Sequence, residues 1–349
     1  MMGNSKDIDW QNRFKSLPEI PIHKKWLENS AITREHQIVY KLVNNIWINE
    51  EESQILLELM NFYSVLYEQL SLLDYSSFSK QDLINFQNYI LYAFNYIATM
   101  TNDFTIDRVY RLIVNEDVTN QNKRIKNLKS LKYPDIEIVK KIGKFNRSNT
   151  PNTNIFYSAE NIDTALKERR PEKGKLISVG VWASTHQKTF SSYVIFHNED
   201  LIKANYEANK AMREFYKKFK NSSPLLLEYM ANYYKLLGRE YSKKVTHHYE
   251  YIISALFSER LMMKETKLNI NHDCIIYPSV GNNHLTSNIA IRPSVLNTHF
   301  HLEKVIEFEI EEEYYDKEYF FSDPEAITLA KIKNLVTSKN INKKGEIEW

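Results

Sequence analysis

The chain has 349 residues, of which 43% are hydrophobic and 26% charged, enough apolar material for one large domain or two modest ones. Its 46 lysines and arginines balance 44 aspartates and glutamates, which argues against a protein that mainly neutralises the phosphates of DNA or RNA. The single Cys274 excludes an intrachain disulfide framework, and seven scattered glycines exclude a Rossmann-type dehydrogenase and a P-loop nucleotidase.

The first hundred residues predict helices. Apolar positions recur at three- and four-residue steps over residues 35–47, 50–67 and 83–100. This part carries no polar constellation, so we expect residues 1–102 to form an all-helical N-terminal module for support or interaction. The polar start leads into no signal core, and no segment reaches the ~18 apolar residues that a membrane helix needs. We therefore expect a soluble, cytoplasmic protein without a membrane partner.

From residue 103 onward the pattern changes to short β-type runs. They cover residues 109–114, 154–158, 176–182, 193–196, 273–277, 288–291 and 304–310. Helical patterns lie between them, at about 204–219, 225–237 and 248–263. The sequence therefore predicts an α+β protein whose mixed β core, residues 103–320, carries a helical insertion.

Two further segments carry weaker signals. The polar, lysine-rich residues 115–141 predict a long surface loop. The last part, residues 321–349, predicts a C-terminal helix and tail, because Asp323-Pro324-Glu325 is a good helix start. We expect the residues from Ser338 onward to be loosely held.

The ten histidines predict no metal site. The chain has no His-Glu-x-x-His motif, and its single cysteine allows no Cys/His cluster. His299 and His301 alternate on a predicted strand without a carboxylate at a compatible spacing. The absence of Gly-x-Ser-x-Gly disfavours an esterase of that type.

Residues 143–171 hold the strongest candidate for chemistry. A polar loop with Arg147 and Asn149 leads into a short strand that carries Tyr157, and a helix with Glu168 follows. Arg147 precedes Tyr157 by ten positions and Glu168 follows it by eleven, so a guanidinium, a phenol and a carboxylate can converge on one cleft. That trio suits a substrate with phosphates and a sugar. The alternative is structural, with Tyr157 in the core and Glu168 in a surface salt bridge.

These residues resemble the core of the RES domain. The blocks Arg-x-Asn, Ile-Phe-Tyr-Ser and Thr-Ala-x-x-Glu with a following Arg-Pro stand in family order. Residues 109–112 are similar to the opening strand of the family, residues 274–280 to its serine-bearing strand and residues 288–291 to the strand after it. The match covers residues 107–310. Family members often carry Gly-Arg directly before the aromatic or small residue and Asn, whereas here Gly143-Lys144 stands earlier, so Lys144 competes with Arg147 as the motif base.

The resemblance implies an ADP-ribosyltransferase-like fold and consumption of NAD⁺. It assigns pyrophosphate or ribose contacts to Arg111 and Arg147, the nicotinamide or ribose pocket to Tyr157, and the acid at the reacting ribose to Glu168. Asn149 is predicted as a further NAD-binding residue, and Ser279 as a hydrogen-bonding neighbour. Many RES proteins are toxins whose antitoxin covers the cleft, so the resemblance also implies a separate antitoxin as a partner.

The chemistry agrees with this assignment. Nicotinamide is a good leaving group in NAD⁺, and breaking its glycosidic bond moves positive charge onto the ribose, which one carboxylate can stabilise. Arginine grips a pyrophosphate with paired charge-assisted bonds. We therefore predict an NAD⁺-degrading toxin or defence effector, with NAD⁺ as substrate and no bound cofactor. ADP-ribosyl transfer to a macromolecule and a non-catalytic nucleotide- or partner-binding module stay as alternatives, and homo-oligomerisation stays open.

Overall fold

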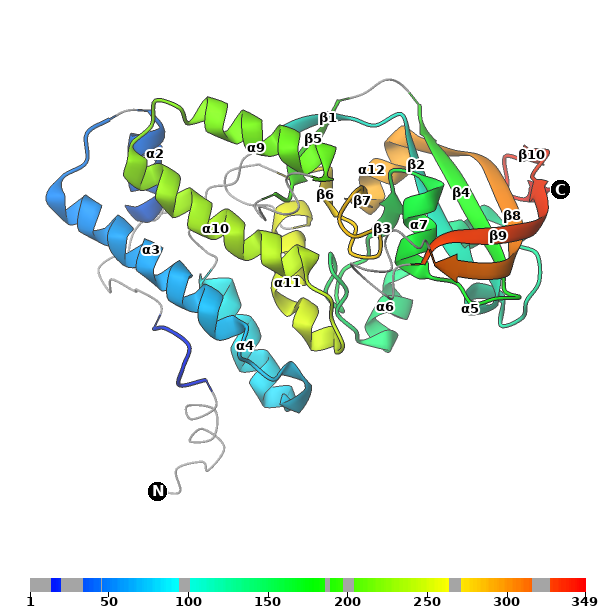
Figure 1. The fold of residues 1–349 in the computed structure, drawn as a ribbon, viewed down its shortest axis with the longest axis horizontal. Coiled ribbons are helices and arrows are strands. Elements are labelled where there is room, and N and C mark those ends of the chain that lie inside the picture. Colours follow the sequence, from blue (N-terminus) through cyan, green and yellow to red (C-terminus); the bar gives the residue numbers. More distant parts are fainter. Residues whose placement is uncertain are drawn as a thin grey trace.

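The computed structural model describes residues 14–19, 34–44, 46–93, 101–185, 189–196, 204–263, 271–315 and 327–349. Helices gather at one end of the molecule and a large sheet forms the other (Figure 1). The α+β class expected from the sequence is therefore confirmed, including the helical N-terminal part. Residues 94–100 and the expected helix start at 323–325 lie outside the described residues.

The helical end combines two parts of the chain. Its elements are α2 (Arg34–Val43), α3 (Glu50–Leu70), η2 (Tyr75–Ser77), α4 (Lys80–Ala93), α9 (Tyr206–Lys218), α10 (Pro224–Ser242), η4 (His248–Tyr251) and α11 (Ile252–Met262). A capping box starts α3, since Asn49 and Glu52 each accept a hydrogen bond from the other's backbone N–H. The ring of Tyr63 on α3 lies 6.0 Å from those of Tyr229 and Tyr233 on α10. The N-terminal helices and the insertion thus share one core.

Within the described residues a nine-stranded sheet has the order β1-β5-β6-β7-β3-β2-β4-β8-β9. The strands are β1 (Asn102–Thr105), β2 (Arg108–Val114), β3 (Phe156–Ala159), β4 (Leu176–Ser184), β5 (Thr189–Val194), β6 (Cys274–Pro278), β7 (Ser287–Ile291), β8 (Phe300–Tyr315) and β9 (Ile327–Thr337). Strands β6 and β7 are buried at every position, as expected at the centre of a covered sheet. The order places β6, β7, β3 and β2 side by side, although two of them come from each half of the chain.

The expectation of a long loop over residues 115–141 is wrong. This segment holds α5 (Asn115–Thr119), η3 (Leu128–Leu131) and α6 (Ile136–Ile142), and α7 (Ile162–Arg169) follows β3. A few apolar side chains, among them Ile125, Leu131 and Val139, are buried between exposed lysines. These buried side chains therefore hold the segment against the rest of the protein, while most of its lysines face the solvent.

The expected C-terminal helix is also wrong where the structure describes it. Residues Ile327–Thr337 form β9, which pairs antiparallel with β8. The short strands β10 (Asn340–Ile341) and β11 (Ile347–Glu348) follow, and the Trp349 indole donates to the carbonyl of Ile125 over 2.9 Å. The expectation that the residues from Ser338 onward are loosely held is therefore wrong as well. The prediction that His299 and His301 alternate on one strand is wrong for His299, which ends α12 (Pro293–His299), whereas His301 lies on β8.

Among the described residues, none of the helices combines the length and the apolarity that crossing a membrane requires.

Candidate active site

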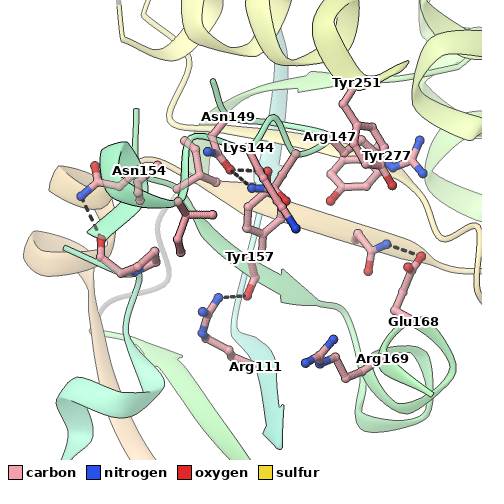
Figure 2. Close-up of a pocket in the computed structure, with 16 residues that line it drawn as sticks. Arg111, Lys144, Arg147, Asn149, Asn154, Tyr157, Glu168, Arg169, Tyr251 and Tyr277 are labelled. Atoms are coloured by element: carbon pink, nitrogen blue, oxygen red, sulfur yellow. Dashed lines mark hydrogen bonds between the residues drawn. The ribbon is translucent and has the colours of Figure 1, made fainter. Parts of the chain in front are cut away.

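Beside the four central strands lies a cavity of about 440 Å³, within the range of roughly 300–1,000 Å³ typical of small-molecule sites. Five of the six predicted site residues line it, namely Arg111, Arg147, Asn149, Tyr157 and Glu168 (Figure 2). Ser279 lies behind Glu168 and donates to it. A smaller cavity of about 190 Å³ adjoins the first, and the two share several lining residues, including Tyr157 and Glu168.

Glu168 is fixed through one carboxylate oxygen. The Asn161 side chain caps α7 by accepting from the N–H of Thr164 over 2.8 Å, and the helix places Glu168 in its last turn. Three donors reach Oε1 of Glu168: Ser279 Oγ at 2.7 Å, Asn288 Nδ2 at 2.7 Å and the Gly281 N–H at 3.2 Å. No described residue hydrogen-bonds to Oε2. The carboxylate is therefore held in place with one oxygen left for a ligand.

The turn after β6 packs directly against the backbone of α7. A Cβ at Gly281 would lie 2.5 Å from the carbonyl oxygen of Lys167 and 2.7 Å from Cα of Glu168, so no larger residue fits without movement. Ser279 in the same turn is fully buried, and its N–H donates to the carbonyl of Thr286 over 2.8 Å. This turn positions Glu168 and does not itself line the cavity.

Tyr157 holds the loop that precedes its strand. Its hydroxyl donates to Asn149 Oδ1 over 2.9 Å and accepts from the N–H of Ser148 over 2.8 Å, and burial raises the pKa of this phenol well above its usual value. A tight turn closes the loop, with the N–H of Asn146 donating to the carbonyl of Asn149 over 3.0 Å. The resemblance assigns Tyr157 to the nicotinamide or ribose pocket, but the hydrogen bonds of its hydroxyl already go to the loop. The ring of Tyr157 lines the cavity.

Arg111 is a half-buried cation at the point where two strands separate. Strands β2 and β3 pair only at Tyr110 and Ala159, and the Arg111 Nη1 donates instead to the carbonyl of Tyr157 over 2.9 Å. Its Cζ lies 5.4 Å from the Phe156 ring centroid, and burial lowers the pKa of this guanidinium to about 10. It forms no ion pair with a carboxylate among the described residues. A half-buried guanidinium without a countercharge, whose Nε is shielded from solvent and has no hydrogen-bond partner, favours an anionic ligand.

Arg147 is tied to the end of the helical insertion. Its Nη1 donates to the carbonyl of Tyr241 over 2.6 Å and its Nη2 to that of Lys243 over 3.1 Å, with Glu240 O at 3.5 Å. Its Cζ lies 4.9 Å above the Tyr251 ring. Because the last carbonyls of a helix have no partner within it, the guanidinium acts as a cap for α10. The competing residue, Lys144, also lines the cavity and points into it (Figure 2).

Asn288, Tyr277 and Tyr251 are among the lining residues that sequence reasoning missed. Asn288 leads the predicted strand at 288–291, and Tyr277 lies opposite it in the β6–β7 register, so the two share one face of the sheet. Both strands were predicted from the sequence, so a prediction that these two strands pair would have identified both residues. Tyr251 comes from η4 in the insertion, and no local sequence signal points to it.

No family model and no curated protein matches this chain. The resemblance to the RES domain therefore stays a prediction, and the function is inferred from the site. A fixed carboxylate with one open oxygen lies in a cavity that also contains Arg111, Lys144 and Arg147. Such a site can bind a phosphate-bearing ligand and stabilise positive charge beside the carboxylate.

Proposed function

We propose that this protein is a RES-like enzyme that cleaves the nicotinamide–ribose bond of NAD⁺. The observation that carries the proposal is the hydrogen bonding of Glu168. Three donors hold Oε1, while Oε2 of this cavity-lining side chain has no partner among the described residues. Because Glu168 is exposed and lines the cavity, a ligand bound there can reach Oε2.

In the proposed reaction the C–N glycosidic bond breaks and its electron pair goes to the nicotinamide nitrogen, which loses its positive charge. Positive charge develops on the ribose at C1′, next to Oε2 of Glu168. Water then forms the new C–O bond at C1′, and its proton passes to the carboxylate or to solvent. Because the charge develops where a fixed carboxylate already stands, little reorganisation is needed.

The other lining groups suit the rest of the dinucleotide. Arg111, Lys144 and Arg147 place positive charge on the cavity wall for the pyrophosphate. The rings of Tyr157, Tyr251 and Tyr277 offer flat apolar surfaces for a base or a pyridine ring. The proposal uses only residues of the chain and NAD⁺ itself.

The test is incubation of the purified protein with NAD⁺ and identification of the products by mass spectrometry, with and without phosphate. We expect release of nicotinamide, with ADP-ribose as co-product if water is the acceptor and its 1-phosphate if phosphate is. Glu168→Gln should lower the rate by about 10²–10³. Glu172→Gln, which removes the same charge from an exposed position outside the cavity, is the matched control. A fully active Glu168→Gln variant would refute the assigned role.

A second candidate is transfer of ADP-ribose to a macromolecule. Glu168 and Arg169 are exposed at the mouth of the cavity, so a large acceptor has access to the carboxylate. Labelled ADP-ribose retained on protein or nucleic acid would identify this reaction.

Tight NAD⁺ binding without turnover would identify a binding module instead. Growth arrest by the wild type but not by Glu168→Ala would support a toxin that a separate antitoxin restrains.

A further inference from the structure

We propose that the dinucleotide lies across Glu168, with its pyrophosphate at Lys144 in the larger cavity and its nicotinamide ring in the smaller one. This inference rests on the proposed function and assigns an orientation to the substrate. It also separates the roles of Lys144 and Arg147, which the sequence left as competitors.

The two cavities differ in charge. The larger one is lined by Arg111, Lys144 and Arg147. The smaller one is lined by apolar groups from Leu112, Ala159 and Ala165 together with the Tyr110 ring. A pyrophosphate is therefore favoured only in the larger cavity, since a charged group without a countercharge is costly to desolvate. A flat, uncharged leaving group suits the smaller one.

The carboxylate stands at the boundary between the cavities. Glu168, Tyr157, Tyr277 and Asn288 line both of them, and so does Arg169. Arg169 is the only cation that lines the smaller cavity within the described residues, and it forms an ion pair with Asp117. When the two halves of the substrate lie in different cavities, the ribose that carries the nicotinamide lies next to Glu168. That position places C1′ beside the carboxylate.

Lys144 is the better direct phosphate ligand of the two competing cations. The guanidinium of Arg147 already donates to the carbonyls of Tyr241 and Lys243, and turning it toward a ligand would leave these helix-end carbonyls without a protein donor. Lys144 makes no hydrogen bond or ion pair with any described residue, and its ammonium group has three donors. Lys144 therefore contacts the phosphates, and Arg147 positions the loop against α10.

The two reaction products separate the two ends of the substrate. ADP-ribose carries the pyrophosphate without a pyridine ring, and nicotinamide carries the ring without a phosphate. Lys144→Ala should raise the Kd of ADP-ribose about tenfold, and less at high salt, while the Ki of nicotinamide stays within about twofold. Leu112→Trp, which fills the smaller cavity from a half-buried position, should give the opposite pattern, with the nicotinamide Ki raised at least about tenfold. Lys141→Ala, an exposed lysine outside both cavities, should change neither.

The outcomes distinguish this inference from the proposed function. If the wild type cleaves NAD⁺ but Lys144→Ala leaves ADP-ribose binding unchanged, or weakens both products equally, the orientation is wrong and the function stands. If the wild type neither cleaves NAD⁺ nor binds either product, the proposed function itself fails. If Leu112→Trp shows no thermal unfolding transition and is therefore not folded, Ala165→Leu takes its place, because it fills the same small cavity from α7. An unchanged nicotinamide Ki in the folded filling variant also overturns the orientation.

Discussion

Gly281→Ala tests whether the turn after β6 sets the position of Glu168. The new Cβ would lie 2.5 Å from the Lys167 carbonyl oxygen and 2.8 Å from the Glu168 nitrogen, whereas ordinary contact begins near 3.4 Å. The turn and α7 must therefore separate by about 0.9 Å, which is the difference between 3.4 and 2.5 Å. This movement also lengthens the 3.2 Å hydrogen bond from the Gly281 N–H to Glu168 Oε1.

A displacement of about 1 Å at a reacting group can cost about 10²-fold in rate. We expect kcat/KM for NAD⁺ to fall by about that factor, together with a stability loss of about 1–3 kcal/mol from overpacking. The assays are nicotinamide release for the rate and urea unfolding for the stability.

Gly174→Ala is a control that should lower the stability of the protein without moving Glu168. Gly174 has φ +81° and no atom within 4 Å of an added Cβ, so alanine there costs backbone strain of about 1 kcal/mol without a steric clash. This control should unfold more easily and keep its rate. If Gly281→Ala retains the wild-type kcat/KM, the close approach does not position Glu168 and the reasoning is wrong.

Three other changes have defined outcomes. Tyr157→Phe leaves the Ser148 N–H without its partner and should cost about 1–3 kcal/mol in urea unfolding, and unchanged stability would show that the hydroxyl does not hold the loop. Arg147→Ala should lower the thermal midpoint because the carbonyls at the end of α10 lose their donor, and an unaltered midpoint contradicts that cap. Burial lowers the pKa of His272 from 6.5 to about 4, so the unfolded chain binds more protons between these values and stability falls as pH drops through that window. His272 contributes about 2 kcal/mol to the loss of stability between pH 7 and 5, so the loss in His272→Phe should be smaller by about that amount when unfolding is measured at both pH values.

The convergence of Arg147, Tyr157 and Glu168 could be predicted because the three lie on one continuous loop–strand–helix unit. Over so short a stretch, strand and helix geometry largely fix where side chains go. The finer roles could not be predicted. The N–H groups of Arg147 donate to carbonyls at the end of α10, almost a hundred residues away in sequence. The Tyr157 hydroxyl donates to Asn149 and so closes a loop instead of facing a ligand.

Two of the wrong expectations, the C-terminal helix and the long loop over residues 115–141, share one physical cause. Asp323-Pro324-Glu325 is a good local helix signal, yet residues 327–337 pair with β8, and hydrogen bonding along a long strand outweighs a weak local preference. Residues 115–141 look like a loop because most of their side chains are polar. Their few apolar residues, such as Leu131, are buried against distant partners that the segment itself does not reveal.

Local patterns in the sequence were enough to predict the element types over most of the chain, the α+β class and the unit that carries Glu168, because periodicity and capping act between near neighbours. The tertiary structure decided which strands adjoin, and so brought Asn288 and Tyr277 to the carboxylate and Tyr251 to Arg147. It also decided which polar groups are already engaged and which face the cavity. Those outcomes depend on contacts between residues far apart in the chain, whose formation requires the whole core to pack at once.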